Sequence, residues 1–452
     1  MNTIETMTMV EIKQMKIEVN NQFCVDILNI NKRLHILKKL EKTDPKWNLE
    51  ISSLNERKSI LKEQQIDLNE YNKSVKCYLN GLFADSCKIL KKLCKKYSNF
   101  ELNDFLVDVY ASYEVACSVL NIKNEYIHKL HEIMTLKLDD AKRKHVSKIY
   151  FIYFLEHLDY LSAKKYIHSY QVVNVEQLNI CPENMCFFKE NDRGKSLLIY
   201  TSGGIGDKIM YARFLQKLCE DYKDNTIILV ITDSLYWIFN QVFKYENLKI
   251  IKDSQRNTLG HFDYHINFFT LPFFLDLNYN EIYPNYYLKN FLNQSNISLD
   301  TNKKNIIINW HGNYENKQEK FNRGMDIEYI VPLLKLKGIN WITVQKEISK
   351  EELSILRKYN VNILNLDNGP DCFKETIALL KKVDLVVSTD TSLVHIAGTM
   401  DINCYVMLSL GCDWRWTRND PTTKWYPNLK LFRQKKSRNW SNVIDELINE
   451  LK

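Results

Sequence analysis

A buried strand that runs directly into a helix start is the feature that most restricts how this chain folds. The apolar, β-branched run 383–387 is short, as a parallel strand covered on both faces must be. Asp390, Thr391 and Ser392 follow at its carboxyl end and supply capping oxygens. Since free N–H groups at a helix start bind anions, the segment predicts a phosphate site with His395 one turn later. An ordinary capped junction with a packed histidine is the alternative.

A second strand-to-helix turn contains three of the 12 glycines in this chain of 452 residues. Residues 196–202 read as another buried strand, and Gly203-Gly204-Ile205-Gly206-Asp207 follows it. Glycines permit a tight turn and allow a ligand to approach the backbone closely. The pattern is shorter than a full G-x-G-x-x-G fingerprint, and no strand that ends in an acidic residue about 20 positions later completes a dinucleotide site.

The second turn begins a series of blocks that resembles one enzyme family. Lys195–Leu215, with Gly-Gly-Ile-Gly-Asp and Tyr-Ala-Arg-Phe-Leu, is similar to the start of the transferase domain in tetratricopeptide-repeat proteins related to the heptosyltransferases, glycosyltransferase family nine. Blocks in the same order follow over roughly residues 190–452: Phe262–Pro272, Ile308–Asn313, Trp341–Lys346, Ser388–Gly398, Asp413–Trp416 and Trp425–Pro427. The resemblance implies an α/β fold of GT-B type, in which two Rossmann-like domains face across a cleft and the second binds most of the nucleotide sugar.

The use of glycine also divides the chain. Only Gly81 precedes residue 190, so the first part lacks the turns that an α/β fold needs and reads as all-α. We expect four regions: a helical hairpin over 1–66, a tetratricopeptide-like helical domain over 67–190, a first Rossmann-like domain over 191–298, and a second, nucleotide-sugar-binding domain with a closing helix over 299–452.

The N-terminal region has apolar residues at helical spacing. Phe23, Ile27, Ile30, Leu34 and Leu37 form one seam, Pro45 interrupts it, and Ile51, Leu54 and Leu61 resume it. The seam spans fewer than three heptads, which favours an intramolecular hairpin over an oligomerising coiled coil, although an oligomer is compatible with the sequence.

Tyr78–Leu90 and Leu158–Ile167 have a tetratricopeptide-like rhythm without a firm period of about 34 residues. Stacked helix pairs would form a concave surface suited to a protein acceptor, and a helical support for the catalytic half is the alternative.

Strand and helix patterns alternate through residues 196–432, which predicts parallel sheets. The expected strands after the first are 226–231, 249–251, 305–310, 340–344, 361–364, 383–389 and 403–408. The polar stretch Asn293–Lys304 is expected to link the two Rossmann-like halves. The resemblance implies that the final amphipathic helix, Val443–Leu451, packs back across the hinge of the cleft.

Composition excludes several classes of protein. With 45% apolar and 26% charged residues the chain reads as globular, and no apolar run approaches the roughly 18 to 20 residues of a membrane span. No signal peptide is evident, so we expect a cytoplasmic protein. Its eleven cysteines lack C-x-x-C spacing, and we expect most of them to be buried, reduced thiols rather than disulfides or metal ligands. The net charge of +7 is mixed along the chain, which suits an anionic donor and argues little for nucleic acid.

Glycosyl transfer requires a base for the acceptor hydroxyl and neutralisation of the departing diphosphate. Asp207 is the candidate base, since the resembling family places an aspartate at the matching Gly-Asp position; a helix cap is the alternative role. His395 is the second catalytic candidate. No Asp-x-Asp motif suggests a metal, so an inverting, metal-independent mechanism without a cofactor is expected. The candidate donor-binding residues are Gly203, Gly204, Gly206, Trp310, Asn313, Arg323, Gln345, Lys346, Asp390, Thr391, Ser392, His395 and Trp414.

Several of these residues have equally ordinary interpretations. Lys346 and Arg323 could be solvated surface cations, Trp310 could belong to the core, and the aromatic residues around Trp414 could hold a loop together. Two other functions also stay open: a noncatalytic scaffold with a degenerate transferase domain, and a sugar-nucleotide epimerase or another Rossmann-type enzyme. A transferase could act on a protein or, alternatively, on a glycan or lipid-linked acceptor.

Overall fold

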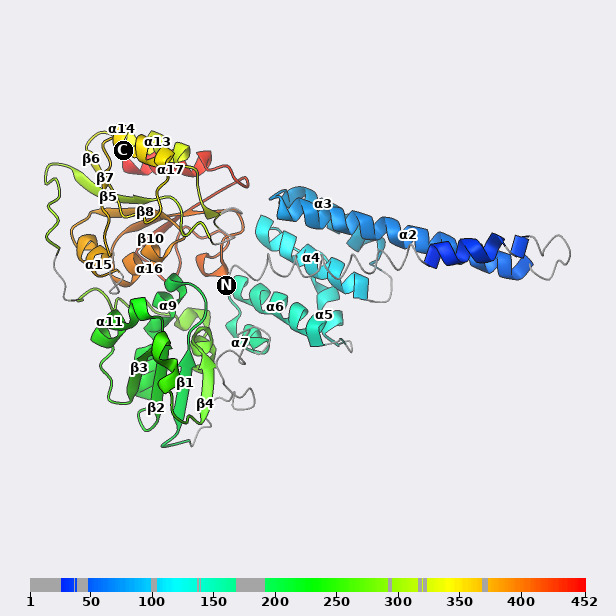
Figure 1. Ribbon diagram of the computed structural model, residues 1–452, viewed down its shortest axis with the longest axis horizontal. Helices are drawn as coiled ribbons and strands as arrows, with labels where there is room; N and C mark the ends of the chain where they lie inside the picture. Colours follow the sequence, from blue (N-terminus) through cyan, green and yellow to red (C-terminus); the bar gives the residue numbers. More distant parts are fainter. Residues whose placement is uncertain are drawn as a thin grey trace. The chain divides into compact units, whose positions relative to one another are not determined.

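The chain divides into two compact units in the computed structural model (Figure 1). The described residues are 26–35, 37–38, 48–98, 104–135, 138, 140–167, 192–291, 295–315, 319, 323–367 and 373–452. One unit comprises Asn2–Ile149 and the other Tyr150–Lys452. The division falls well before residue 190, where the composition of the sequence changes, so the last helices of the N-terminal region belong to the α/β unit.

The described part of the helical unit contains the helical residues 26–35 and 37–38, followed by α2 (Asn48–Leu79), α3 (Phe83–Lys96), α4 (Asp104–Leu120), α5 (Ile127–Thr135) and the first part of α6 (Asp140–Glu156). Gly81 lies in the turn between α2 and α3 with a φ of +75°, a conformation that costs glycine little. A helix pair therefore spans the Tyr78–Leu90 segment, as its rhythm indicates. Its identity as a tetratricopeptide repeat stays a prediction.

The apolar seam of the expected N-terminal hairpin is confirmed within the described residues. Ile30, Leu34 and Leu37 form one buried cluster with Ile51, and Leu54 and Leu61 pack against it. Phe23 and Pro45 lie outside the described residues. The alternating spacing of three and four residues thus places one stripe of each helix in contact with the other.

The end of α6 and the short helix α7 (Tyr160–Lys164) pack on the α/β part of their unit. The Tyr160 ring lies 5.7 Å from that of Phe273 and 6.0 Å from that of Trp414. Glu156 accepts a charge-assisted hydrogen bond from Arg418. These contacts explain why the unit boundary lies ahead of the first strand.

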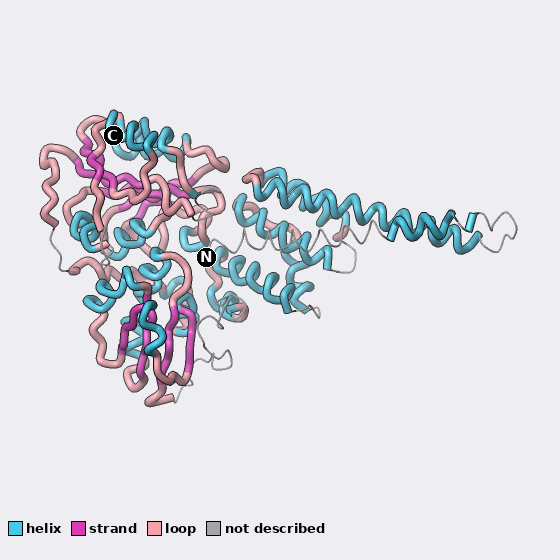
Figure 2. The backbone as a smooth tube through the Cα atoms, viewed as in Figure 1, coloured by secondary structure: helices cyan, strands magenta, loops and turns pink. Residues whose placement is uncertain are grey.

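The first sheet has four parallel strands in the order β3-β2-β1-β4. The strands are β1 (Ser196–Tyr200), β2 (Thr226–Ile231), β3 (Leu248–Lys252) and β4 (Tyr264–Asn267). The connecting helices are α9 (Ile205–Tyr211), α10 (Leu215–Asp221), α11 (Asp233–Val242) and α12 (Leu271–Phe274). Figure 2 shows this sheet and the second as two separate groups of strands.

The second sheet has six parallel strands in the order β10-β9-β8-β5-β6-β7. Its strands are β5 (Lys304–Asn309), β6 (Ile339–Thr343), β7 (Asn362–Ile363), β8 (Leu385–Thr389), β9 (Cys404–Leu408) and β10 (Leu429–Arg433). Counted from β5, this is the doubly wound Rossmann order, whose direction reverses between β5 and β8. Ligands of such sheets bind at the carboxyl ends of the strands beside that reversal. Both Rossmann-like domains that the resemblance implies are therefore present.

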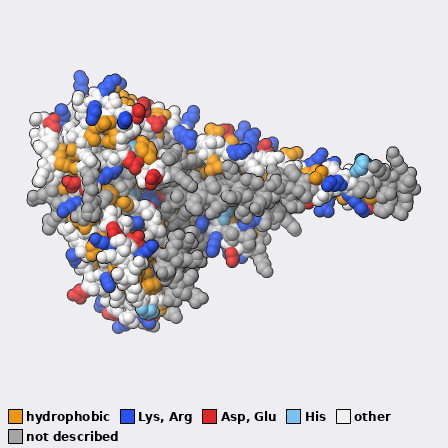
Figure 3. All heavy atoms as spheres, in the orientation of Figure 1, with side chains coloured by type: hydrophobic (Ala, Val, Ile, Leu, Met, Phe, Trp, Pro, Cys, Tyr) orange, Lys and Arg blue, Asp and Glu red, His pale blue; other side chains and the backbone are white. Residues whose placement is uncertain are grey.

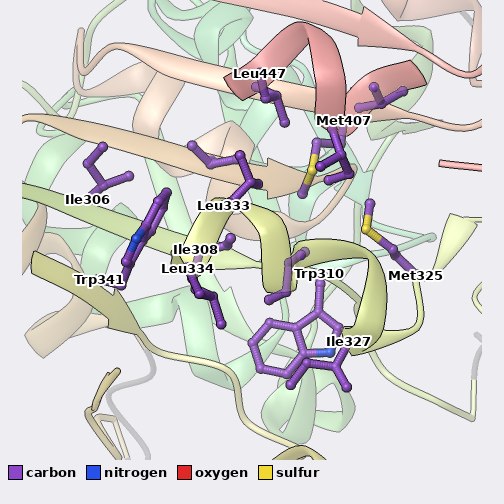
Figure 4. Packing of buried hydrophobic residues seen from close by; sticks show 14 of the residues in the cluster. Ile306, Ile308, Trp310, Met325, Ile327, Leu333, Leu334, Trp341, Met407 and Leu447 are labelled. Carbon is purple, nitrogen blue, oxygen red and sulfur yellow. The ribbon is translucent and has the colours of Figure 1, made fainter. Parts of the chain in front are cut away.

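The remaining helices cover the second sheet: α13 (Ile327–Leu334), α14 (Lys350–Lys358), α15 (Lys374–Leu380), α16 (Ser392–Thr399) and α17 (Ser441–Leu451). The expected position of the last helix is wrong. Leu447 of α17 and Leu333 of α13 belong to the core cluster of the second domain, so α17 completes that core instead of crossing the hinge (Figure 4). Its one apolar stripe, with Val443, Ile444 and Leu447 buried, is satisfied there.

Two strands were not among those expected from the sequence. β4 begins within an aromatic-rich block, and Lys430 and Arg433 interrupt the apolar character of β10, which lies at a sheet edge. The eight other strands lie where the pattern places them, with ends shifted by one or two residues. The expected linker at Asn293–Lys304 has no helix or strand over its described residues 295–303.

The surface has a mixed charge. On the face shown in Figure 3, Lys and Arg side chains of the described residues are scattered among acidic and apolar ones. Over the described part of the chain, no helix combines the length and the apolar character that crossing a membrane requires.

Candidate active site at the junction of the Rossmann-like domains

The two strand-to-helix turns singled out in the sequence lie against each other. α9 follows β1 of the first sheet, and α16 follows β8 of the second, beside the reversal of strand order. A Cβ on Gly206 of α9 would lie 2.5 Å from Cδ2 of His395 on α16, which is closer than real Cβ contacts. Glycine at this position therefore lets the two domains approach at their candidate ligand-binding edges.

Asp207 caps its own helix and also contacts the second domain. Its Oδ2 accepts a hydrogen bond from the Gly204 N–H at 3.1 Å, which caps α9. Its Oδ1 lies 2.6 Å from Nη2 of Arg415, a residue of the second domain. Burial alone would raise the pKa of Asp207, but the adjacent guanidinium and the Gly204 bond together hold it well below its usual range.

Arg415 stands in the short 3₁₀ turn Trp414–Trp416 and is held from two sides. Asp413 binds it through two parallel hydrogen bonds of 3.0 Å, from Nε to Oδ1 and from Nη2 to Oδ2. Asp413 Oδ1 also accepts from the backbone N–H of Arg415 at 3.2 Å. Such a forked contact fixes the plane of the guanidinium as well as its position.

His395 is buried among these groups and is neutral at physiological pH. Burial, together with the nearby charge of Arg415, lowers its pKa to about 3. Its Nε2 lies 3.4 Å from Nη1 of Arg415, and because arginine only donates, Nε2 is the acceptor. The proton then resides on Nδ1, which donates to the Tyr426 hydroxyl at 3.0 Å.

Arg213 connects the first domain to the aromatic loop of the second. Its Nη1 donates to the carbonyl of Trp425 at 2.6 Å, and its guanidinium lies 5.0 Å from the Trp425 ring centroid and 4.6 Å from that of Tyr426. The ring centroids of Trp416 and His395 are 5.5 Å apart. The Asp-Trp-Arg-Trp and Trp-Tyr-Pro blocks thus surround the histidine and the ion pair.

Gly398 allows Tyr426 to reach His395. A Cβ at this position would lie 2.3 Å from Cδ1 of the buried Tyr426 ring. We therefore expect Gly398→Ala to lower the free energy of unfolding by about 1–3 kcal/mol, since the ring has no room to retreat. Chemical denaturation monitored by circular dichroism measures the change. Gly260→Ala is the matched control, because its Cβ would meet nothing within 4 Å; equal effects of the two substitutions would contradict this account.

The polar residues after β8 lie at the same junction. Thr391 and Ser392 are half-buried at the start of α16, and the Thr391 hydroxyl lies 3.0 Å from that of Ser388. Asp390 Oδ1 is 3.8 Å from Nε2 of His395, too far for a hydrogen bond. These residues stay candidate donor ligands.

The residues after β5 and β6 contact one another. Gln345 donates from Nε2 to the carbonyl of His311 at 3.0 Å, and its Oε1 has no hydrogen-bond partner among the described residues. Asn313 is exposed. The Trp310 ring is completely buried in the core of the second domain, beside Ile327 in Figure 4, and donates to Glu352 at 2.7 Å. This placement agrees with the core interpretation of Trp310.

The two cations proposed for the donor are engaged in internal contacts. Arg323 forms an ion pair with Glu319, whose other oxygen accepts from the Gly312 N–H at 2.9 Å. Lys346 Nζ donates to the backbone carbonyls of Leu366 and Asp367. A donor would have to compete with these partners, so neither cation is presented as a free ligand.

Three further candidates have clear structural roles. Gly203 has a φ of +72°, and a Cβ there would lie 2.6 Å from Cζ of Phe269, so this turn requires glycine. Gly204 precedes α9 as its N-cap. Trp414 packs edge-on against Tyr160 and against Trp425, at 5.8 Å from the latter. Trp414 therefore fastens the loop that carries Arg415.

Sequence reasoning did not select four residues at this junction: Arg213, Asp413, Arg415 and Tyr426. All four belong to blocks that carry the family resemblance. Their spacing gave no indication that they meet, because Arg213 and Tyr426 are separated by most of the α/β region.

The described residues contain no group of three or more His, Cys, Asp or Glu side chains that could hold a metal ion. Their cysteines are free thiols.

A cavity of about 590 Å³ is lined by Lys304, Asp384, Asn403, Leu429 and neighbouring residues. It lies at the amino ends of the strands of the second sheet, the edge opposite to the junction, so it is not the candidate donor site.

Comparison with known proteins gives structural likenesses only. No family model and no curated protein match the chain. The E. coli heptosyltransferase WaaC with ADP-2-deoxy-2-fluoro heptose matches 57% of this chain and 100% of its own at 13% identity, with a TM-score of 0.38. The glycosyl transferase family 9 from Veillonella parvula DSM 2008 matches 56% of this chain and 88% of its own at 10% identity, with a TM-score of 0.33.

A third solved structure is the dodecameric iron-containing heptosyltransferase TibC in complex with ADP-D-beta-D-heptose. It matches 58% of this chain and 78% of its own at 11% identity, with a TM-score of 0.36. Likeness at this level carries no argument about activity, which has to rest on the residues of this chain.

Proposed function

We propose that this protein is a glycosyltransferase that moves a sugar from a nucleotide diphosphate sugar to an acceptor hydroxyl, with inversion and without a metal ion. The observation that carries the proposal is the meeting of Asp207 from the first domain with Arg415 and His395 from the second. A carboxylate lies there beside a cation and a helix start, which are the groups that the two halves of the transfer require.

Each step of the transfer has a candidate group. Asp207 takes the proton of the acceptor hydroxyl while the hydroxyl oxygen bonds to the anomeric carbon of the sugar. The bond between that carbon and the diphosphate oxygen breaks, and the nucleoside diphosphate leaves with the electron pair. Backbone N–H groups at the start of α16 and the hydroxyls of Thr391 and Ser392 stabilise the developing charge.

A screen of UDP-, GDP-, ADP- and CMP-sugars by thermal unfolding of the full chain tests the proposal. A bound donor at about 100 times its dissociation constant should stabilise the protein by roughly 2.7 kcal/mol. The corresponding nucleosides, which lack phosphate, are the control and should have little effect. The proposal fails if neither nucleotide sugars nor nucleoside diphosphates stabilise the chain.

Removal of metal ions is expected to leave transfer intact. The cation at the junction is a guanidinium, which can stabilise a leaving diphosphate without a divalent ion. Turnover measured with and without excess EDTA should agree within about twofold, whereas an enzyme that depends on a metal ion would lose charge stabilisation worth several kcal/mol. Activity that EDTA abolishes and manganese restores would overturn the metal-independent mechanism.

We further propose that the acceptor is a protein, held through the helical unit. Consecutive helices from α2 to α5 pack on one another, the kind of arrangement that exposes an extended surface to a polypeptide. A transferase acting on a small saccharide needs little beyond its two Rossmann-like domains. A glycan or lipid-linked acceptor is the alternative that the acceptor assay must include.

A further inference from the structure

The guanidinium of Arg415 is shared between carboxylates of two different domains. Asp413 holds it from the same turn through two hydrogen bonds of 3.0 Å. Asp207 reaches it from α9 of the first domain, with a single contact of 2.6 Å. The candidate base is thus engaged, and in this state its carboxylate is poorly basic because the adjacent positive charge stabilises its ionised form.

The other basic groups around the junction have different contacts or a lowered pKa. Arg213 donates to the carbonyl of Trp425 and stacks on the neighbouring rings. His395 is neutral, and burial lowers the pKa of Lys208. Arg415 is distinguished from Arg213 by its contacts, since its guanidinium touches both the Asp207 carboxylate and His395 of α16.

Arg415 also lies beside the loop that would receive the diphosphate. Its Nη1 is 3.4 Å from Nε2 of His395, a residue of α16, and Asp390 at the end of β8 contributes to its electrostatic environment. The hydroxyls of Thr391 and Ser392 stand at the start of the same helix. A diphosphate bound to this helix start would be adjacent to the guanidinium.

We propose that Arg415 exchanges partners when the donor binds: it leaves Asp207, takes up the diphosphate, and frees the Asp207 carboxylate for the acceptor hydroxyl. The inference rests on the proposed function, because it requires a diphosphate donor at the start of α16. It assigns Arg415 as a donor-binding residue that also controls the availability of the base.

The contacts decide which carboxylate is displaced. Asp413 is two residues from Arg415, forms the forked contact and accepts from the Arg415 backbone, so local structure holds this pair together. Asp207 contributes one contact from another domain and keeps its bond to the Gly204 N–H after the exchange. A phosphate oxygen can replace the Asp207 oxygen because it accepts the same charge-assisted hydrogen bond.

The exchange would couple chemistry to the presence of the donor. Once the guanidinium is bound to phosphate, its charge no longer offsets the effect of burial, which raises the pKa of Asp207. The base would then be strongest when the nucleotide sugar is in place. Before donor binding, the ion pair keeps the carboxylate occupied and connects the two domains.

Calorimetric titration of the full chain with inorganic pyrophosphate tests the exchange. The variants are Asp207→Asn, Arg415→Gln and the double variant. Asp207→Asn should bind pyrophosphate about tenfold more tightly than wild type, because the competitor is removed, and Arg415→Gln should bind it about tenfold more weakly. When Arg415→Gln is already present, adding Asp207→Asn should increase the affinity for pyrophosphate by less than about twofold.

Asp263→Asn is the control. Asp263 accepts hydrogen bonds from Ser196 at the amino end of β1, the edge of the first sheet opposite to the junction, so loss of its charge should leave the affinity for pyrophosphate unchanged. Circular dichroism first establishes that each variant is folded. Arg415→Met, which keeps an extended side chain, replaces Arg415→Gln if the latter fails to fold.

The outcomes separate the inference from the proposed function. If wild type binds pyrophosphate but Asp207→Asn shows no gain, or shows the same gain with and without Arg415, the exchange is rejected while the transferase proposal stands. If neither wild type nor Asp207→Asn binds pyrophosphate or any nucleoside diphosphate, the transferase proposal fails and the exchange fails with it.

Discussion

Asp207→Asn is expected to reduce the rate of sugar transfer by about 100-fold or more while the protein still binds its donor. General base catalysis contributes roughly 10² to 10⁴ to such reactions, and the amide cannot accept the proton of the acceptor hydroxyl. Asparagine has nearly the same shape and retains an oxygen that can accept from the Gly204 N–H, so the cap of α9 should survive. The turnover number at saturating donor and acceptor is the measurement.

The control for this substitution is Asp233→Asn. Asp233 is likewise an aspartate at the start of a helix in the first domain, but it is exposed and accepts from the backbone N–H of Ser254 at 3.0 Å, whereas Asp207 is buried against Arg415. Its turnover should stay close to that of wild type. Near-normal turnover of Asp207→Asn would make Asp207 only a helix cap and would require another base.

Removal of residues 1–139 is expected to abolish efficient transfer to a protein acceptor and to leave donor binding intact. The shortened chain begins with α6, since the end of this helix and α7 pack on the α/β unit through Tyr160 and Glu156. Loss of a tethering surface lowers the effective concentration of the acceptor at the site, with effects that reach about 10² to 10⁴. Catalytic efficiency towards the protein acceptor is measured for both chains.

Two further measurements make this comparison decisive. Thermal unfolding with and without the nucleotide sugar shows whether the shortened chain is folded and binds its donor. Slow hydrolysis of the donor in the absence of acceptor gives a rate that does not depend on tethering, so it should change little. A folded, shortened chain that modifies the protein with unchanged efficiency would reject the acceptor role and leave the helices a structural one.

Local sequence was sufficient for most of the α/β region. The β-branched run of β8 and the apolar run of β1 predict buried parallel strands, because only strands covered on both faces lack polar alternation. The seam of Ile30, Leu34 and Leu37 likewise predicts a helix that packs on the segment beginning at Ile51. These are short-range patterns, and each is decided by the periodicity of one element.

Some elements could not be placed from such patterns. β10 contains lysine and arginine, and it is a strand because it pairs with β9 at the edge of the sheet. α17 has a clear apolar stripe, but the stripe does not say which surface it covers, and only the structure shows that it completes the core with α13. A hydrophobic face specifies that a partner exists and leaves its identity to the tertiary fold.

The candidate site shows the same division. The sequence alone determined that two strand-to-helix turns carry Gly206, Asp207 and His395, since the types of residue needed at such turns are local requirements. Only the tertiary structure decided that the turns face each other and that Arg415 stands between them. The ion pair of Asp207 with Arg415 joins residues from two domains, and no periodicity records a contact between segments so far apart. Its existence depends on how two separately folded sheets pack, which is a property of the whole α/β unit.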